Sequence, residues 1–217
     1  MEVKATKLTD VTLLQSANSF TSGKESRMTL ERAYAAGHTP IRTQLFWIEC
    51  TDVPLFVASQ FVRSHVGVQA FMKSKRIDRG GEDFREVCES IAGNVEKVAA
   101  HLSTGNIDFL DDAVADVRSL PTRFDRYAPT NVAFLINAEA LMNMAHKRFC
   151  MMASVEARIL MQKIKDAVEV VDPALAKHLV PMCVYRGDIC TEPRSCHYNE
   201  SNFGTAEVEQ YKELVKN

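Results

Sequence analysis

Side chains suited to binding an anion recur between residues 60 and 76. They are Gln60, Arg63 and His65, followed after a short interval by Ser74, Lys75 and Arg76. Guanidinium groups bind phosphate oxygens through paired hydrogen bonds, and a serine hydroxyl adds a further donor. Two interpretations stay open on spacing alone, a phosphate-binding site and a solvated basic loop.

A further arginine, Arg148, stands in an apolar setting. The stretch from Pro129 to Met161 has no glycine or further proline, so it predicts one long buried helix from about Thr130. At about 100° per residue, Asn137 and Arg148 fall on nearly the same line of that helix. A buried arginine without an anion carries a heavy desolvation cost. We therefore expect Arg148 to pair with a glutamate, such as Glu139 or Glu156, or to face a ligand.

Cysteines gather near the C-terminus. They are Cys183, Cys190 and Cys196, with His197 beside the last. Thiolates brought together by turns bind zinc, although the spacing differs from the common paired Cys-x-x-Cys pattern, and free thiols are the alternative. The other three, Cys50, Cys88 and Cys150, stand singly and are interpreted as small apolar residues.

The composition is ordinary for a globular protein. The chain has 217 residues, 46% hydrophobic and 25% charged, with a net charge of -2. We expect one domain over residues 1–217, in which residues 183–217 form a cysteine-rich C-terminal extension. The charge gives no basic footprint for a nucleic-acid polymer, and no apolar run is long enough to span a membrane. No signal-peptide pattern opens the chain, so a cytoplasmic location is expected.

The elements that must position these residues follow from periodicity and caps. We expect an opening strand and a short turn within residues 1–20, helices over 29–36, 54–67, 82–101 and 107–120, and a strand over 45–50. A charged loop surrounds Gly80-Gly81, a short helix runs from Asp172 through Leu179, and a polar helix follows Gly204. The fold class is therefore α+β, a small mixed or antiparallel sheet with several helices, including the long buried one.

Two blocks resemble the flavin-dependent thymidylate synthases, and the resemblance covers residues 39–188. In INAEALMNMAHKRFCMMASVEAR the matching residues are Asn137, Leu141, Asn143, Arg148 and Glu156. In PLFVASQFVRSHVGVQAFMKSKR they are Gln60, Arg63, Ser74 and Arg76, and VYRGDI resembles the family's closing segment. The resemblance implies a homotetramer whose sites draw residues from several subunits. It also implies conversion of dUMP to dTMP, with FAD as hydride carrier, methylenetetrahydrofolate as carbon donor and NADPH as reductant.

The resemblance also assigns residues. The dUMP site would contain Gln60, Arg63, Ser74, Lys75, Arg76, Arg126 and Arg148. Arg148 would be catalytic, favouring ionisation of the pyrimidine at N3 and so activating C5 without an enzyme thiol. The FAD site would contain Thr39, Arg63, His65, Asn137 and Asn143.

The chain departs from the family pattern at several of these positions. Glu139 replaces an arginine, Arg42-Thr43 replaces a glutamate-histidine pair, and Ser64-His65 replaces histidine-arginine. Two alternatives therefore stand beside thymidylate synthesis. One is another C5 modification, hydroxymethylation or methylation of dUMP or dCMP. The other is a catalytically lapsed nucleotide-binding oligomer, stabilised by zinc at its cysteines.

Overall fold

An antiparallel sheet lies at the centre of the fold. The computed structural model describes residues 1–73, 84–104, 115, 126 and 128–216, and within them the strand order is β1-β2-β4-β3. The strands are β1 (Glu2–Lys7), β2 (Leu45–Pro54), β3 (Val68–Met72) and β4 (Pro129–Asn137). Every neighbouring pair is antiparallel. The α+β class with a small antiparallel sheet is thereby confirmed.

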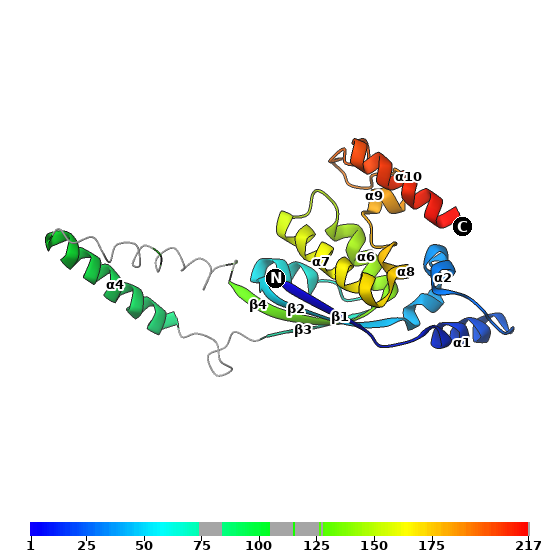
Figure 1. Ribbon diagram of the computed structural model, residues 1–217, viewed down its shortest axis with the longest axis horizontal. Helices are drawn as coiled ribbons and strands as arrows, with labels where there is room; N and C mark the ends of the chain where they lie inside the picture. The colour runs from blue at the N-terminus through cyan, green and yellow to red at the C-terminus, as the bar shows by residue number, and fades with distance from the viewer. Residues whose placement is uncertain (74–83, 105–114, 116–125, 127, 217) are drawn as a thin grey trace.

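Helices cover one face of this sheet (Figure 1). In chain order the helices of the described residues are α1 (Val11–Ser22), α2 (Leu30–Ala36), the 3-10 helix η1 (Thr39–Thr43), α3 (Leu55–Phe61), α4 (Phe84–Thr104), α6 (Ala138–Arg148), α7 (Val155–Val171), α8 (Pro173–Ala176), α9 (Met182–Tyr185) and α10 (Asn202–Lys216). Figure 1 shows α6, α7 and α8 over the sheet and α9 and α10 beyond them, while α4 lies apart.

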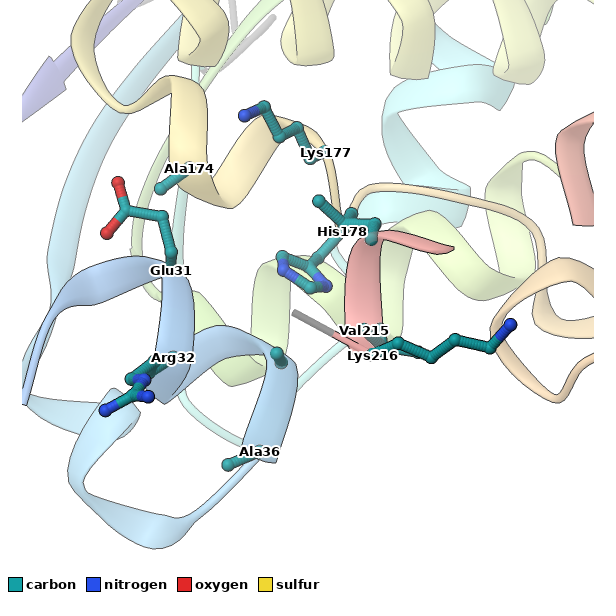
Figure 2. A pocket seen from close by; sticks show the side chains of 10 residues that line it. Glu31, Arg32, Ala36, Ala174, Lys177, His178, Val215 and Lys216 are labelled. Carbon is teal, nitrogen blue, oxygen red and sulfur yellow. The ribbon is translucent and has the colours of Figure 1, made fainter. Parts of the chain in front are cut away.

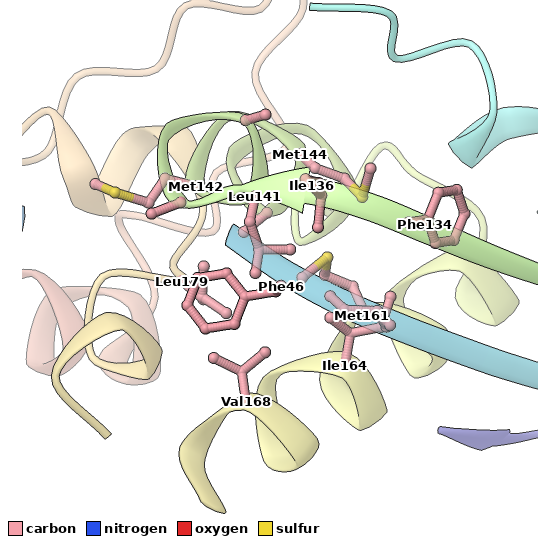
Figure 3. Close-up of a cluster of buried hydrophobic side chains, with 14 of the residues drawn as sticks. Phe46, Phe134, Ile136, Leu141, Met142, Met144, Met161, Ile164, Val168 and Leu179 are labelled. Carbon is pink, nitrogen blue, oxygen red and sulfur yellow. The ribbon is translucent and has the colours of Figure 1, made fainter. Parts of the chain in front are cut away.

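The main core lies between the sheet and helices α6 and α7 (Figure 3). Alternate residues of β4 are buried, among them Val132, Phe134 and Ile136, as period-two side-chain geometry requires. From the helices, Leu141 and Ile164 meet this face. Burying each such side chain contributes roughly 1.5–3 kcal/mol, so this layer holds α6 in place.

The predicted single helix from Thr130 to Met161 is wrong. That stretch forms β4, α6, a turn and α7. The side chain of Asn137 accepts a hydrogen bond from the Ala140 amide at 2.9 Å and starts α6 as its N-cap. Ser154 caps α7 in the same way through the Ala157 amide at 3.3 Å. Apolar residues with period two before Asn137 belong to a strand, whatever their helix propensity.

The N-terminal elements are partly as predicted. Strand β1 and helix α2 are confirmed, and Thr29 and Gly37 cap α2 at its two ends. Helix α1 is missed, although Asp10 caps its start through the Thr12 amide and Gly23 ends it at a φ of 69°. The helix expected over residues 54–67 ends at Phe61, and strand β3, which follows, is also missed.

Later elements agree more closely with expectation. Strand β2 and helices α4, α8 and α10 occur where periodicity places them, although α8 ends at Ala176. The expected helix over residues 107–120 and the Gly80-Gly81 loop lie outside the described residues. No helix in the described part of the chain is long and apolar enough to cross a membrane.

A second, smaller core joins α9 to α10. It consists of Val180, Val184, Val208 and Tyr211. Helix α9 also contacts α6, so this C-terminal unit rests against the helix that carries Arg148. Residues 180–211 therefore have apolar packing of their own, distinct from the main core. The expectation of one domain over residues 1–217 stays a prediction.

Candidate functional site

Arg148, the last residue of α6, lies against the end of α3. Its Nη2 donates to the backbone oxygen of Gln60, and its guanidinium carbon lies 5.4 Å from the centre of the Phe61 ring. Its buried Nε has no hydrogen-bond partner in the described structure. Burial, and then the charge of Arg63, lower the pKa of Arg148. A guanidinium with an unused donor, beside a second guanidinium, is suited to hold an anion.

Neither glutamate considered for Arg148 is its partner. Glu139 pairs instead with Arg42 of η1, through Nε to Oε2 at 2.6 Å and Nη2 to Oε1 at 3.1 Å. None of the ion pairs in the described residues joins Arg148 to Glu156 or to any other carboxylate. Of the two alternatives, this arrangement favours a ligand as the partner of Arg148.

The loop after α3 carries Arg63 and His65, both exposed. Its end is fixed to the start of α6, because the Asn137 amide donates to the Gly67 oxygen at 3.0 Å. Gly67 has a φ of 71°, and a Cβ there would lie 2.5 Å from Nδ2 of Asn137. Only glycine fits, so this contact holds the Arg63 loop beside α6. Arg148, at the other end of α6, contacts Gln60 directly, and the charge of Arg63 acts on it.

Asn137 differs from its predicted placement. It precedes α6, so the helical line that was expected to join it to Arg148 does not exist. The length of α6, about 16 Å at 1.5 Å per residue, separates the two residues. Oδ1 of Asn137 is occupied by the Ala140 amide. Nδ2 is therefore the atom of this side chain that is available to contact FAD.

Two other predicted FAD residues, Thr39 and Asn143, are exposed on η1 and α6. Helix η1 packs against α6, and the Arg42–Glu139 ion pair joins the two elements. Thr39 and Asn143 therefore belong to neighbouring elements, away from the α3 end where Arg148 lies. Arg42 and Glu139 both depart from the family pattern in charge, but the sequence alone did not predict that they pair with each other.

Of the other residues predicted to bind dUMP, the structure describes Arg126. The Arg126 guanidinium carbon lies 4.5 Å from the centre of the Phe56 ring, and the Arg126 oxygen accepts from the Phe56 amide at 2.9 Å. This is the opposite end of α3 from Gln60. Arg126 thus contacts the first turn of α3, about 7.5 Å along the helix from the turn that Arg148 contacts. Three further predicted residues, Ser74, Lys75 and Arg76, lie outside the described residues.

His146 is a buried polar residue to which sequence reasoning gave no role. It is 3% exposed, and neither ring nitrogen has a partner in the described structure. Its ring centre lies 4.4 Å from that of Tyr185. Burial, followed by the charges of Arg186 and His178, lowers its pKa to about 4. The ring is therefore neutral near pH 7. Most of its neighbours in the sequence are apolar, so the sequence did not indicate a buried histidine without hydrogen-bond partners.

A separate pocket of about 310 Å³ lies between α2, α8 and α10 (Figure 2). Charges of both signs surround it, from Glu31, Arg32, Lys177 and Lys216. Figure 2 shows the His178 imidazole at this pocket, and His178 Nδ1 lies 3.0 Å from the Tyr211 hydroxyl. None of the predicted substrate or cofactor residues lines it.

The described residues form an α+β fold around a small antiparallel sheet. Arg63, after α3, and Arg148, at the end of α6, form its candidate anion site. No protein-family model matches the sequence, and the comparison with curated proteins found no match.

Solved structures do share the fold. Two crystal structures of thymidylate synthase X (ThyX) from Helicobacter pylori with FAD and dUMP are each 17% identical in sequence. Their TM-scores are 0.52 and 0.55. The matches cover 81% and 83% of this chain, and 99% and 100% of the ThyX chains. A UMP/dUMP methylase, PolB from Streptomyces cacaoi bound with 5-Br dUMP, is 12% identical over 82% of this chain and 94% of its own. Its TM-score is 0.47, too low to carry an argument. The chain therefore has the fold of the flavin-dependent thymidylate synthase ThyX.

Proposed function

We propose that this chain is a divergent flavin-dependent thymidylate synthase, converting dUMP to dTMP. One observation carries the proposal: Arg148 has an unpartnered buried Nε, feels the charge of Arg63 and forms no ion pair in the described structure, in a fold shared with an enzyme crystallised with dUMP. Two adjoining cations repel each other, and an anionic ligand relieves that repulsion. A nucleotide monophosphate with an ionisable imide supplies such an anion.

In this proposal Arg148 is catalytic. Its guanidinium lies beside the pyrimidine and stabilises the negative charge that develops when N3 loses its proton, which makes C5 nucleophilic. Gln60 fixes the guanidinium through its backbone oxygen, and Phe61 covers one face of it. Arg63 holds the nucleotide from the loop after α3. We propose that Ser74, Lys75, Arg76 and Arg126 bind the phosphate.

The residues proposed for FAD fit a polar cofactor. The side chains of Thr39, Arg63, His65 and Asn143 are exposed. They make no hydrogen bond to the described residues, so their donors and acceptors are available. FAD, when bound, supplies hydride transfer from NADPH to the carbon donated by methylenetetrahydrofolate. The chain's own part is to bind and orient the cofactor next to Arg63.

Two departures from the family pattern compensate each other. Where the family has glutamate and arginine, this chain has Arg42 and Glu139, and the two form a bidentate ion pair. The exchange keeps opposite charges on η1 and α6. The reversal at Glu139 therefore leaves no uncompensated negative charge beside Thr39, which supports retention of the cofactor site.

Oligomerisation is part of the proposal. Asn143 and Arg148 are five residues apart on α6, so their side chains point roughly 140° apart around the helix. Asn143, proposed for FAD, and Arg148, proposed for dUMP, therefore lie on different sides of α6. We propose a homotetramer in which different subunits supply the two residues to each site.

The test is a titration of the purified protein with FAD, then dUMP, following the flavin spectrum. Product analysis by mass spectrometry follows, with methylenetetrahydrofolate and NADPH. We expect bound flavin whose spectrum shifts with dUMP, and a product one methyl group heavier than dUMP. A hydroxymethyl product, or reaction of dCMP alone, would support the alternative C5 modification. Binding of dUMP without flavin binding or turnover would overturn the proposal in favour of a lapsed enzyme.

A further inference from the structure

Four cysteines line one small cavity beside the C-terminal unit. They are Cys150, Cys183, Cys190 and Cys196. The cavity has a volume of about 20 Å³, which is room for roughly one water molecule or one ion. All four side chains are partly buried, and all are free thiols. Four thiols that line one small cavity supply the donor set of a metal site.

The fold gathers these cysteines from three places. Cys150 lies in the turn between α6 and α7, and Cys183 lies in α9. The other two lie in the segment between α9 and α10. That segment is bent by positive φ angles at Gly187, Asp188 and His197. Cys150, which stands alone in the sequence, is thereby added to the three C-terminal cysteines.

The ends of this segment are held together. The Asp188 amide donates to the Cys183 oxygen at 2.8 Å, and Nδ2 of Asn199 donates to Oδ1 of Asp188 at 2.8 Å. A Cβ on Gly204 would lie 1.9 Å from the Tyr198 oxygen, so α10 begins in close contact with the segment's end. These contacts keep Cys190 and Cys196 near α9.

His197 takes no part, because its ring is exposed and its Nδ1 lies 3.1 Å from the Glu200 carboxylate.

Within the described residues, no three His, Cys, Asp or Glu side chains are yet close enough to ligate a metal. Binding therefore requires the thiols to close on the cavity. Residues 189–196 belong to no helix or strand, so Cys190 and Cys196 can move inward without breaking regular backbone hydrogen bonds. Cys150 and Cys183 are set by α6 and α9 and form the fixed half of the site.

We propose that Cys150, Cys183, Cys190 and Cys196 bind one Zn²⁺ tetrahedrally. Four thiolates are the ligand set of closed structural zinc sites, and each thiol gives up its proton to solvent when it ligates. The metal would tie the α9–α10 unit to the end of α6, two residues beyond Arg148. This inference does not depend on the proposed function.

The test uses the full chain, purified without chelator from zinc-supplemented cells, with metal content measured by mass spectrometry. We expect one zinc per chain, and cobalt in its place should give the visible absorption of tetrahedral thiolate coordination. Cys150→Ser and Cys190→Ser should each lose the metal, whereas the exposed Cys88→Ser should keep it. Zinc retained by Cys150→Ser would overturn the assignment of the fourth ligand.

Thiol alkylation keeps the test decisive if a variant fails to fold. In the unmodified protein, zinc should protect these four cysteines from iodoacetamide, and a chelator should expose them, while Cys88 reacts in both cases. Equal labelling with and without zinc, absence of stoichiometric metal, or a disulfide between two of the four would each overturn the proposal.

Discussion

Asp172 is a buried charged residue and Arg148 a half-buried one, and their surroundings differ. The Asp172 carboxylate accepts from Nζ of Lys7 at 2.7 Å, the Tyr34 hydroxyl at 2.8 Å and the Leu175 amide at 3.0 Å. Arg148 has one backbone acceptor and a buried Nε with none in the described structure. A buried charge with all its partners stabilises a fold, whereas one left short of partners indicates a place for a ligand.

The same contrast separates the two buried histidines. His178 has the Tyr211 hydroxyl at 3.0 Å, and His146 has no partner among the described residues. Asp172 and His178, on either side of α8, have partners, whereas His146 and Arg148 of α6 have buried atoms without one in the described structure, as do Gln44 and Thr130 elsewhere. The contrast therefore separates changes that should unfold the protein from changes that should inactivate it.

Asp172→Ala should have the largest effect on stability. It leaves the Lys7 ammonium, whose side chain is 16% exposed, without its counter-ion and removes the cap of α8. We expect the free energy of unfolding to fall by about 3–5 kcal/mol. Urea denaturation measures it, with Asp52→Ala as control because Asp52 is 72% exposed. A loss no greater than that of the control would show that the network is not structural.

Arg148→Lys should reduce activity and leave stability unchanged. Lysine keeps the charge but loses the planar donor set, so we expect kcat for dTMP formation to fall about 10²–10³-fold. The urea midpoint should stay unchanged. The exposed Arg27→Lys is the matched control. A parallel loss of stability and activity would place Arg148 with Asp172 as a structural residue.

Acid should destabilise the protein through both histidines. Burial is the first cause that lowers the pKa of each to about 4, followed for His178 by the charge of Lys177. The unfolded chain takes up protons from about pH 6.5, so stability is complete above that pH and is lost as pH falls toward 4. We expect about 2 kcal/mol per histidine to be lost by pH 5.

Urea midpoints at pH 7.5 and pH 5 measure this loss, and His146→Gln and His178→Gln should each reduce it. His178→Gln should also lower stability at pH 7.5, because Tyr211 loses its partner. His146→Gln should not. Equal effects of the two substitutions at pH 7.5 would contradict the contrast between them.

The Arg42–Glu139 pair should contribute least. Its arginine side chain is 56% exposed, so each single reversal, Arg42→Glu or Glu139→Arg, should cost about 0.2–1 kcal/mol. The double reversal should restore most of it, which a double-mutant cycle on urea midpoints measures. Failure of the double variant to recover would show that the two side chains do not act as a pair.

Local patterns predicted much of the fold. Caps at Thr29 and Gly37 set α2, and aromatic and β-branched residues set β2. The errors came where helix propensity competed with period-two burial, as in β4, or where a short exposed strand such as β3 left almost no apolar pattern. Tertiary burial decided both cases, and a single sequence does not report it.

The site was predicted only in part. Arg148 contacts Gln60 and feels the charge of Arg63, while the roles of these residues toward a ligand stay predictions. The Arg42–Glu139 pair and the addition of Cys150 to the cysteine cavity depend on contacts between distant segments. No spacing rule connects position 42 with 139, or 150 with 183.

The antiparallel pairing of β2 with β4 has a consequence for how the chain folds. These central strands are adjacent in the sheet, yet residues 55–128 separate them in the chain. Their pairing requires an early closure over a long distance, which slows folding. Closure entropy grows only with the logarithm of loop length, about 0.6 kcal/mol for each doubling. The sheet should therefore tolerate large changes of length between β3 and β4 during evolution, at a far smaller cost than an insertion within β4 itself.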